Sequence, residues 1–125
     1  MKNLVKVLSL SFAVLSATLL FSCKKDKTSS HVVEYKVSVS SGTLSTVVHT
    51  NSQGNSTTIT GVGNTTWSSG QITIPSSVQV VNIAADGNSS SAAAAMTVQI
   101  IVDGVLKKEN TTIGSVMSSQ SSYQF

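Results

Sequence analysis

The sequence predicts an all-β protein: a single antiparallel β-sandwich of seven or eight strands, immunoglobulin-like in size and preceded by a signal peptide helix. Apolar residues recur at every second position from His31 onward, which is the spacing of a strand with one buried face. From residue 23 onward threonine and valine are abundant while leucine, glutamate and alanine are scarce outside one tract, a composition that favours strands over helices. Turn signals follow one another too closely for the crossover helices of an α/β domain.

The first two strands follow from this alternation and from one glycine. A first strand starts near His31, with its apolar face formed by Val33, Tyr35, Val37 and Val39. Gly42 interrupts the pattern, and a second strand is expected over Thr43–Thr50. In a regular strand of this sequence one face would carry Leu44, Thr46 and Val48.

Turn residues separate the next strands. The segment Asn51-Ser52-Gln53-Gly54 is a turn signal, so Ser56–Val62 is expected to return antiparallel to the second strand. Gly61, Gly63 and Asn64 then indicate another turn before Trp67. A short strand over Gln71–Ile74 ends at Pro75, because proline has no N–H to donate to a continuing ladder.

The following segment is mostly β-branched. It predicts a strand over Val78–Ala84, in which the adjacent apolar residues Val80 and Val81 indicate either a bulge or burial on both faces. The residues Asp86-Gly87-Asn88 and the serines after them are expected to form a loop.

The clearest strand lies near the end of the chain, and its apolar face consists of Met96, Val98, Ile100 and Val102. Asp103-Gly104 is typical of a two-residue hairpin turn, which needs positive φ at both positions, so Val105–Asn110 is expected to pair back. Gly114–Ser122 is weakly patterned, and Ser121–Phe125 is a candidate for a last edge strand.

The start of the chain is typical of an export signal. Lys2 and Lys6 precede an apolar stretch over residues 4–21, and Leu20-Phe21-Ser22-Cys23 resembles the lipobox of bacterial lipoproteins. The resemblance implies acylation of the Cys23 thiol, with chains such as palmitate, and cleavage after Ser22. The alternatives are an ordinary secretory signal and a retained membrane helix, and the several serines in the stretch disfavour the helix.

These features divide the chain into three parts. Residues 1–22 are expected to be a lipoprotein signal peptide that is removed, residues 23–30 a polar tether after the lipidated Cys23, and residues 31–125 the sandwich. The whole chain carries a net charge of +3, but without Lys2 and Lys6 six lysines face five acidic residues and leave +1. The charge therefore gives no reason to expect nucleic acid as a partner.

Residues with catalytic or ligand-binding chemistry are few. Cys23 is the only cysteine, so after acylation neither a disulfide nor a thiolate metal ligand remains. His31 and His49 have no second ligand at metal-binding spacing and are expected to be solvated residues on a surface strand or strand end. No nucleophile elbow is present, so we expect no catalysis, no cofactor and no metal. Trp67 is either a packing residue at one end of the sandwich or a platform for a sugar or lipid.

Three segments resemble the MmpS family, the small membrane-attached proteins first described in mycobacteria. They are Val33–Val37 (VEYKV), Trp67–Pro75 (WSSGQITIP) and Ile100–Asn110 (IIVDGVLKKEN), and the last is the most specific. The resemblance implies a β-sandwich beyond the cytoplasmic membrane and an accessory role beside large transporters that export lipids or siderophores. Family members commonly have a transmembrane helix, and often late-strand cysteines where this chain has Val98 and Tyr123.

The function expected from the sequence is contact, not catalysis. We expect a lipid-anchored, non-enzymatic β-sandwich of the bacterial cell envelope that contacts an envelope protein or transporter, in a periplasmic or surface-facing position and preferentially at the outer membrane. Lys24, Lys25 and Lys27 suit either a solvated spacer or contact with anionic headgroups. The alternative function is a surface lipoprotein module that binds a small ligand or glycan through Trp67 and its neighbouring loops.

Overall fold

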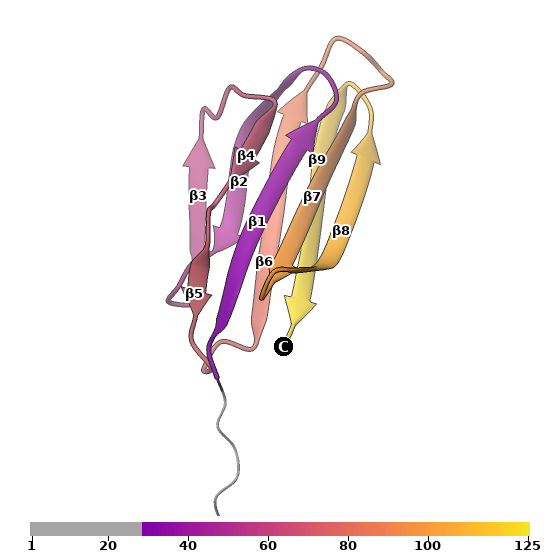
Figure 1. The fold of residues 1–125 in the computed structure, drawn as a ribbon. Coiled ribbons are helices and arrows are strands. Elements are labelled where there is room, and N and C mark those ends of the chain that lie inside the picture. The colour runs from indigo at the N-terminus through magenta and orange to yellow at the C-terminus, as the bar shows by residue number, and fades with distance from the viewer. Residues whose placement is uncertain (1–28) are drawn as a thin grey trace, which may run out of the picture.

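The computed structural model describes residues 29–125 as two antiparallel β-sheets that pack face to face (Figure 1). This part of the chain contains strands and no helix, so the predicted all-β sandwich is confirmed. Cys23, the signal peptide over residues 1–22 and residues 23–28 of the tether lie outside the described residues.

Each sheet is built around two long central strands. The first sheet, here the β1 sheet, has the order β4-β1-β7-β8, and its strands are β1 (His31–Val39), β4 (Thr66–Ser68), β5 (Ile72–Ile74), β7 (Ala95–Val102) and β8 (Val105–Ile113). The second, here the β2 sheet, has the order β3-β2-β6-β9, and its strands are β2 (Thr43–Thr50), β3 (Ser56–Thr60), β6 (Val80–Asn88) and β9 (Val116–Gln124).

Residues 29–125 form nine strands where the sequence predicts seven or eight. Two short strands share one edge of β1: β5 pairs with His31–Val33 and β4 with Lys36–Ser38. The kink between them is tied to β1 at Tyr35, whose N–H donates to Ser69 Oγ and whose carbonyl accepts from the Ser69 N–H. Trp67 therefore lies in a strand of its own, which is too short to leave an alternating pattern in the sequence.

The strands run between two ends of the molecule. At the entry end, residue 29 joins β1, the Asp103-Gly104 turn joins β7 to β8, and the chain stops at Phe125 (Figure 1). At the far end lie the loops that follow β1, β3 and β6 and the turn between β8 and β9. The predicted hairpin is confirmed, because Asp103 and Gly104 have φ values of 50° and 80°.

The core lies between the sheets and follows the alternation expected for β1 and β7. Both strands bury every second side chain, and the fully buried residues of largest volume include Tyr35, Leu44, Ile74, Ile83, Met96, Ile100 and Met117. Sheets that pack in this way lie about 10 Å apart with their inward side chains interdigitated, so each strand contributes one face to the core.

The face predicted for β2 is wrong beyond its first residues. Leu44 is buried as expected, but Val47 and His49 are buried in place of Thr46 and Val48. The pairing of β2 with β6 shifts between Leu44 and Thr46, so Ser45 is an extra residue in a β-bulge. One inserted residue moves every later side chain to the opposite face.

The predicted loop over Asp86–Asn88 is also wrong, because these residues continue β6 in pairing with β2 and β9. Val81, Ile83, Ala85 and Gly87 are buried while Val80 is 44% exposed, so no bulge separates Val80 from Val81. The strand has no room for a side chain at Gly87, because neighbouring atoms already fill that space. A Cβ there would lie 2.8 Å from Met96 Cε and 2.8 Å from the Thr43 carbonyl oxygen.

The last two strands are longer than predicted. β9 spans Val116–Gln124 and pairs along its whole length with β6, although its sequence is mostly serine and glutamine. β8 continues to Ile113 and approaches β9 through side-chain hydrogen bonds. Asn110 Nδ2 donates to Ser119 Oγ at 3.1 Å and to the Gln120 carbonyl at 3.0 Å, which links the two sheets along this side.

Candidate functional site

Three ring side chains meet at the side of the sandwich formed by β2 and β4. Tyr35 points inward from β1, His49 from β2 and Trp67 from β4, where Trp67 pairs with Val37. The ring centroids of Tyr35 and His49 are 5.2 Å apart, and those of His49 and Trp67 are 5.4 Å apart. These three residues, here the aromatic cluster, join the two sheets through ring contacts.

His49 is the least expected member of the aromatic cluster. The sequence predicts a solvated histidine, but His49 is only 7% exposed because the bulge at Ser45 turns it toward the core. Its Nδ1–H donates to the Thr50 carbonyl at 3.2 Å. The ring is therefore enclosed by Tyr35 and Trp67 and held by the backbone, which suits packing better than proton transfer at the surface.

The Tyr35 hydroxyl group is buried without a hydrogen-bond partner among the described residues. Burial raises the pKa of Tyr35 to about 12, because ionisation would place a charge among apolar side chains, and the nearby Thr50 side chain opposes the shift. The Thr50 Oγ1 accepts a hydrogen bond from the Asn82 N–H at 2.9 Å. The Tyr35 hydroxyl group thus lies in the core near the Thr50 side chain, and within residues 29–125 no partner meets hydrogen-bond geometry.

Trp67 packs against the core and is partly exposed. It also contributes to the lining of a shallow hollow of ≈ 290 Å³ on the outer side of the β1 sheet, with Lys36, Val37, Ser38, Thr66, Ser68 and Gln99. The ring of Trp67 therefore lies against His49, as the packing interpretation expects, while polar side chains of neighbouring residues line the hollow.

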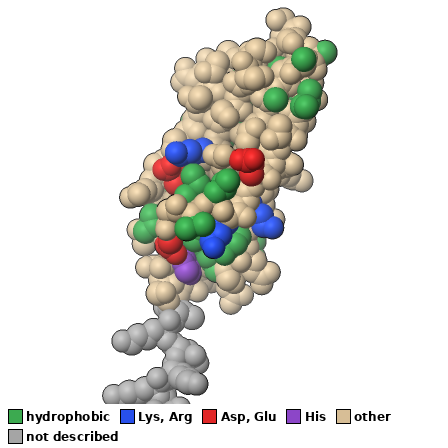
Figure 2. All heavy atoms as spheres, turned by 45° about the vertical axis from the view of Figure 1, so that its right-hand side comes forward, with side chains coloured by type: hydrophobic (Ala, Val, Ile, Leu, Met, Phe, Trp, Pro, Cys, Tyr) green, Lys and Arg blue, Asp and Glu red, His purple; other side chains and the backbone are tan. Residues whose placement is uncertain are grey.

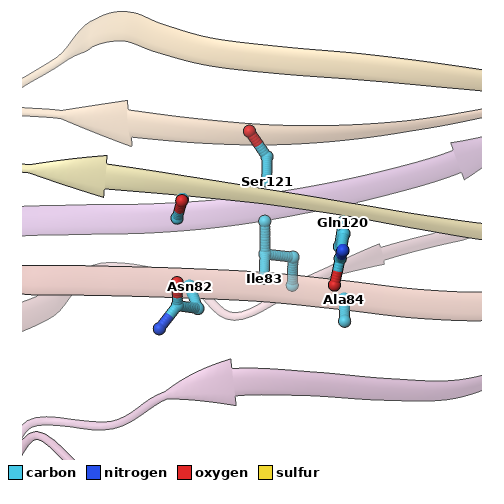
Figure 3. Close-up of a pocket in the computed structure, with 6 residues that line it drawn as sticks. Asn82, Ile83, Ala84, Gln120 and Ser121 are labelled. Atoms are coloured by element: carbon cyan, nitrogen blue, oxygen red, sulfur yellow. The ribbon is translucent and has the colours of Figure 1, made fainter.

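A second shallow hollow of ≈ 380 Å³ lies on the outer face of the β2 sheet, between β6 and β9. It forms where the small side chain of Ala84 lies beside the longer side chains of Asn82 and Gln120 (Figure 3). The neutral, mostly small lining offers hydrogen bonds but no charged group, so it carries no indication of a particular ligand.

At the entry end, the start of β1 contacts both the β7–β8 turn and the last residue of the chain. His31 Nδ1–H donates to Asp103 Oδ2 at 2.7 Å, and the Val32 N–H donates to Asp103 Oδ1 at 3.0 Å. These bonds hold the pKa of Asp103 below its usual value, with the His31 bond as the largest cause. The Phe125 ring stacks on His31 at a centroid distance of 4.5 Å and an angle of 2° between the ring planes. His31 thus fixes the last residue and the β7–β8 turn to the first strand.

The remaining candidate residues either lie apart from one another in the structure or precede the residues that it describes. Cys23, Lys24, Lys25 and Lys27 precede residue 29 and lie outside the described part. Within residues 29–125, no three His, Cys, Asp or Glu side chains come together in a group that would hold a metal ion. His31 and His49 lie in different contacts, one with Asp103 at the entry end and one in the aromatic cluster.

Exposed apolar side chains form the feature that sequence reasoning missed. At the far end, Ile113 is 68% exposed and Val116 is 82% exposed, one on each side of the turn between β8 and β9. The signal was available, because both are β-branched apolar residues in segments that the sequence left outside strands. We call Ile113 and Val116 the far-end pair.

Fold and site together define a class: a small antiparallel β-sandwich, with a single cysteine in its sequence and with sheets joined by ring contacts and side-chain hydrogen bonds. The model of the family described as Mycobacterium membrane protein matches residues 11–120. Because this match spans more than half of the chain, the chain belongs to that family, the MmpS-type membrane proteins, and the family predicted from three segments is confirmed.

Family membership makes the chain a membrane-associated protein of the cell envelope. Among the residues that the structure describes, no helix has the length and apolar character needed to cross a bilayer. None of the curated proteins compared with the chain matches it.

Proposed function

We propose that this protein is a lipid-anchored, non-enzymatic component of the bacterial cell envelope that acts by contact with another envelope component. In this proposal the acylated Cys23 holds the sandwich at a membrane, with the outer membrane as the expected location. MmpS-type membership supports a membrane-associated role, and the lipobox-like segment supports the lipid as the means of attachment. Acyl chains give stable anchoring when two or more are present, as on a lipoprotein cysteine.

The observation that carries the proposed contact is the far-end pair. Ile113 and Val116 are the two most exposed large apolar residues in the described range, and they flank one turn at the end opposite the entry of the chain. Exposed apolar side chains gathered at one place are typical of interaction sites. A partner that approaches from the side away from the anchor would meet the far end of the sandwich, where this turn lies.

Photo-crosslinking in intact cells tests the contact. A photoreactive phenylalanine at position 116 is expected to give one discrete adduct, because Val116 is 82% exposed at the proposed interface. Ile113→Asp in the same chain should abolish the adduct, whereas Thr111→Asp, on the same strand and also exposed, should leave it. An adduct that persists unchanged in the Ile113→Asp variant would contradict the proposed site.

A transporter is the partner class that the MmpS resemblance implies. The identity of the adduct tests this point separately from the existence of the contact. A large transporter in the crosslinked band would support an accessory role in export, whereas another envelope protein would keep the contact and remove the transporter from the proposal.

The hollow beside Trp67 favours a second candidate function, the binding of a glycan or other small polar ligand. Its lining includes side chains that hydrogen-bond hydroxyl groups, namely Lys36, Ser38 and Gln99, and Trp67 also contributes to it, although its ring lies against His49. Trp67 is the only tryptophan, so its fluorescence reports on the part of the sandwich beside this hollow. Quenching or a spectral shift on addition of envelope glycans would support this function, and an unchanged spectrum would oppose it.

A further inference from the structure

Six large apolar side chains are exposed in the described part of the chain, and they divide between the two ends of the sandwich. Two form the far-end pair. The other four occupy the first or second position of β1, β6 and β8 at the entry end, and we call them the entry-end ring: Val32, Val80, Val105 and Leu106. Their exposed fractions lie between 37% and 54%.

The entry-end ring surrounds an end of the molecule and does not cover one sheet face. Val32 and Leu106 belong to the β1 sheet, where Leu106 pairs with Ile101. Val80 belongs to the β2 sheet, where it pairs with Gln124. A partner lying flat against one sheet would cover only part of this ring. A planar surface that meets the end of the sandwich would cover all of it.

Basic side chains accompany the ring. Lys107 and Lys108 follow Leu106 directly, and neither forms an ion pair with any residue from 29 to 125. The nearby acidic groups have other partners: Asp103 binds His31 at 2.7 Å, Glu34 binds Lys36 at 3.3 Å, and Glu109 accepts a hydrogen bond from Gln99 Nε2 at 2.6 Å. Figure 2 shows apolar side chains beside blue and red ones in the lower half of the molecule, close to the grey trace. Apolar residues next to unpaired lysines fit an anionic lipid surface, since lysine stems lie along apolar groups while their ammonium groups reach the headgroups.

The path of the chain brings the same end to the bilayer. His31 follows Cys23 by eight residues, which extend to about 28 Å at most. β1 then runs away from the entry end for nine residues, about 30 Å. A lipid on Cys23 therefore holds the entry-end ring nearer to the membrane than the far-end pair.

We propose that the entry-end ring inserts into the interfacial layer of the anchoring bilayer, with Lys107 and Lys108 on anionic headgroups, so that the sandwich stands upright with its far end away from the lipid. The inference rests on the lipid anchor proposed above and adds a second, protein-mediated contact with the same membrane. Its function is to orient the far-end pair toward a partner.

Site-specific fluorescence in vesicles tests the orientation. Acylation blocks Cys23, so an introduced cysteine is the only free thiol of the full-length lipoprotein. An environment-sensitive fluorophore is attached at Leu106→Cys or Val80→Cys in the entry-end ring, or at Ser90→Cys, an exposed residue of the far-end loop that serves as the control. The acylated proteins are reconstituted in phosphatidylcholine vesicles that contain phosphatidylglycerol and lipids spin-labelled near the headgroup.

The proposal predicts blue-shifted emission and strong quenching at positions 106 and 80, with water-like emission and no quenching at position 90. Lys107→Glu together with Lys108→Glu should reduce quenching at position 80 when phosphatidylglycerol is present and have little effect when it is absent. Circular dichroism of each labelled protein confirms that the sandwich is intact.

Three results would overturn the proposal. Equal quenching at all three positions would mean that the sandwich has no preferred orientation, and no quenching at positions 106 and 80 would mean that the ring stays in water. If these positions are protected from water in cells but not in vesicles, the ring binds a protein and not the bilayer. Failure of the lipid anchor itself is distinguishable, because the protein would then not float with the vesicles at all.

Discussion

At the scale of single residues, the Tyr35 hydroxyl group makes a clear stability prediction. It is fully buried and has no hydrogen-bond partner among residues 29–125, so it contributes a desolvation cost without the compensating bond. Tyr35→Phe is expected to raise the free energy of unfolding by about 1 kcal/mol at neutral pH. Urea unfolding checks the value, and a loss of stability in the variant would show that the hydroxyl group has a partner in solution.

The same residue predicts a response to alkaline pH. The pKa of Tyr35 is raised from 10.0 to about 12 in the folded protein, so above pH 10 the unfolded state loses this proton more readily than the folded state. The free energy of unfolding is therefore unaffected by this ionisation below pH 10 and falls as the pH rises toward 12. Tyr35→Phe should remove this loss, whereas Tyr123→Phe, a partly exposed residue of β9, should leave it in place. Unfolding at pH 8 and pH 11 measures both. Equal alkaline losses in Tyr35→Phe and the unmodified protein would contradict the assignment.

Asp103 is expected to make the free energy of unfolding fall at acid pH, opposite to the alkaline loss expected from Tyr35. Its pKa is lowered from the ordinary value of an aspartate by the bonds from His31 and the Val32 N–H. Its contribution to stability is therefore present above that ordinary value and is lost as the pH falls through the lowered pKa. Asp103→Asn should therefore flatten the acid limb of the stability curve, and Asp86→Asn, a β6 residue exposed near the far end, should change it less. The prediction fails if both variants show the same acid limb.

The residues of the candidate site differ in how far the sequence could predict them. Trp67 was identified from its chemistry, because it is the only tryptophan and follows a turn. His49 was predicted at the surface, since its place in the alternation depends on the bulge at Ser45. A bulge is set by contacts between strands, and a single strand's sequence does not encode it.

At the scale of elements, prediction succeeded where one face is apolar and a specific turn follows. β7 and the Asp103-Gly104 hairpin combine regular alternation with a turn that few residue pairs can form. β9 was predicted only at its end, because its serines and glutamines give little contrast between faces even though the strand pairs fully with β6. Asp86–Asn88 resembles a turn in composition, yet pairing on both sides keeps it extended.

Gly87 is the most restrictive position of β6. A Cβ would approach Met96 Cε and the Thr43 carbonyl oxygen to 2.8 Å each, and the backbone contact cannot move without disturbing β2. Gly87→Ala is expected to lower the free energy of unfolding by about 2 kcal/mol, the usual cost of an overpacked core. Asn88→Ala, the exposed next residue, is the control and should change stability by less than about 0.5 kcal/mol. Thermal or urea unfolding that ranks the two variants equally would contradict the close packing.

The link between β8 and β9 makes a separate prediction. Asn110 donates hydrogen bonds to Ser119 Oγ, in a residue that is 3% exposed, and to the Gln120 carbonyl. Asn110→Ala should lower the free energy of unfolding by about 1–2 kcal/mol, because both acceptors lose their donor. Thr111→Ala removes only an exposed hydroxyl pair with Thr97 within one sheet and should cost less. Hydrogen exchange at β9 amides should increase in the first variant only.

At the scale of the whole molecule, the two ends of the sandwich carry different surfaces. Among residues 29–125, the entry end has four exposed apolar residues and two lysines without an ion-pair partner in this range, and the far end has the far-end pair. The fold class and the family were predictable, because strand alternation and three short segments survive in the sequence. The division of exposed apolar residues between the two ends was not predictable, because it depends on which strands begin or end at the same end of the sandwich.

The central claim is that a lipid on Cys23 holds this sandwich at a membrane. Mass spectrometry of the N-terminal peptide of the mature protein, purified from its native membrane, measures this directly. The account predicts a peptide that begins at Cys23 and carries the added mass of two or three acyl chains, with Cys23→Ala protein recovered in the soluble fraction. A mature chain that begins elsewhere, or an unmodified Cys23 in membrane-bound protein, would contradict it.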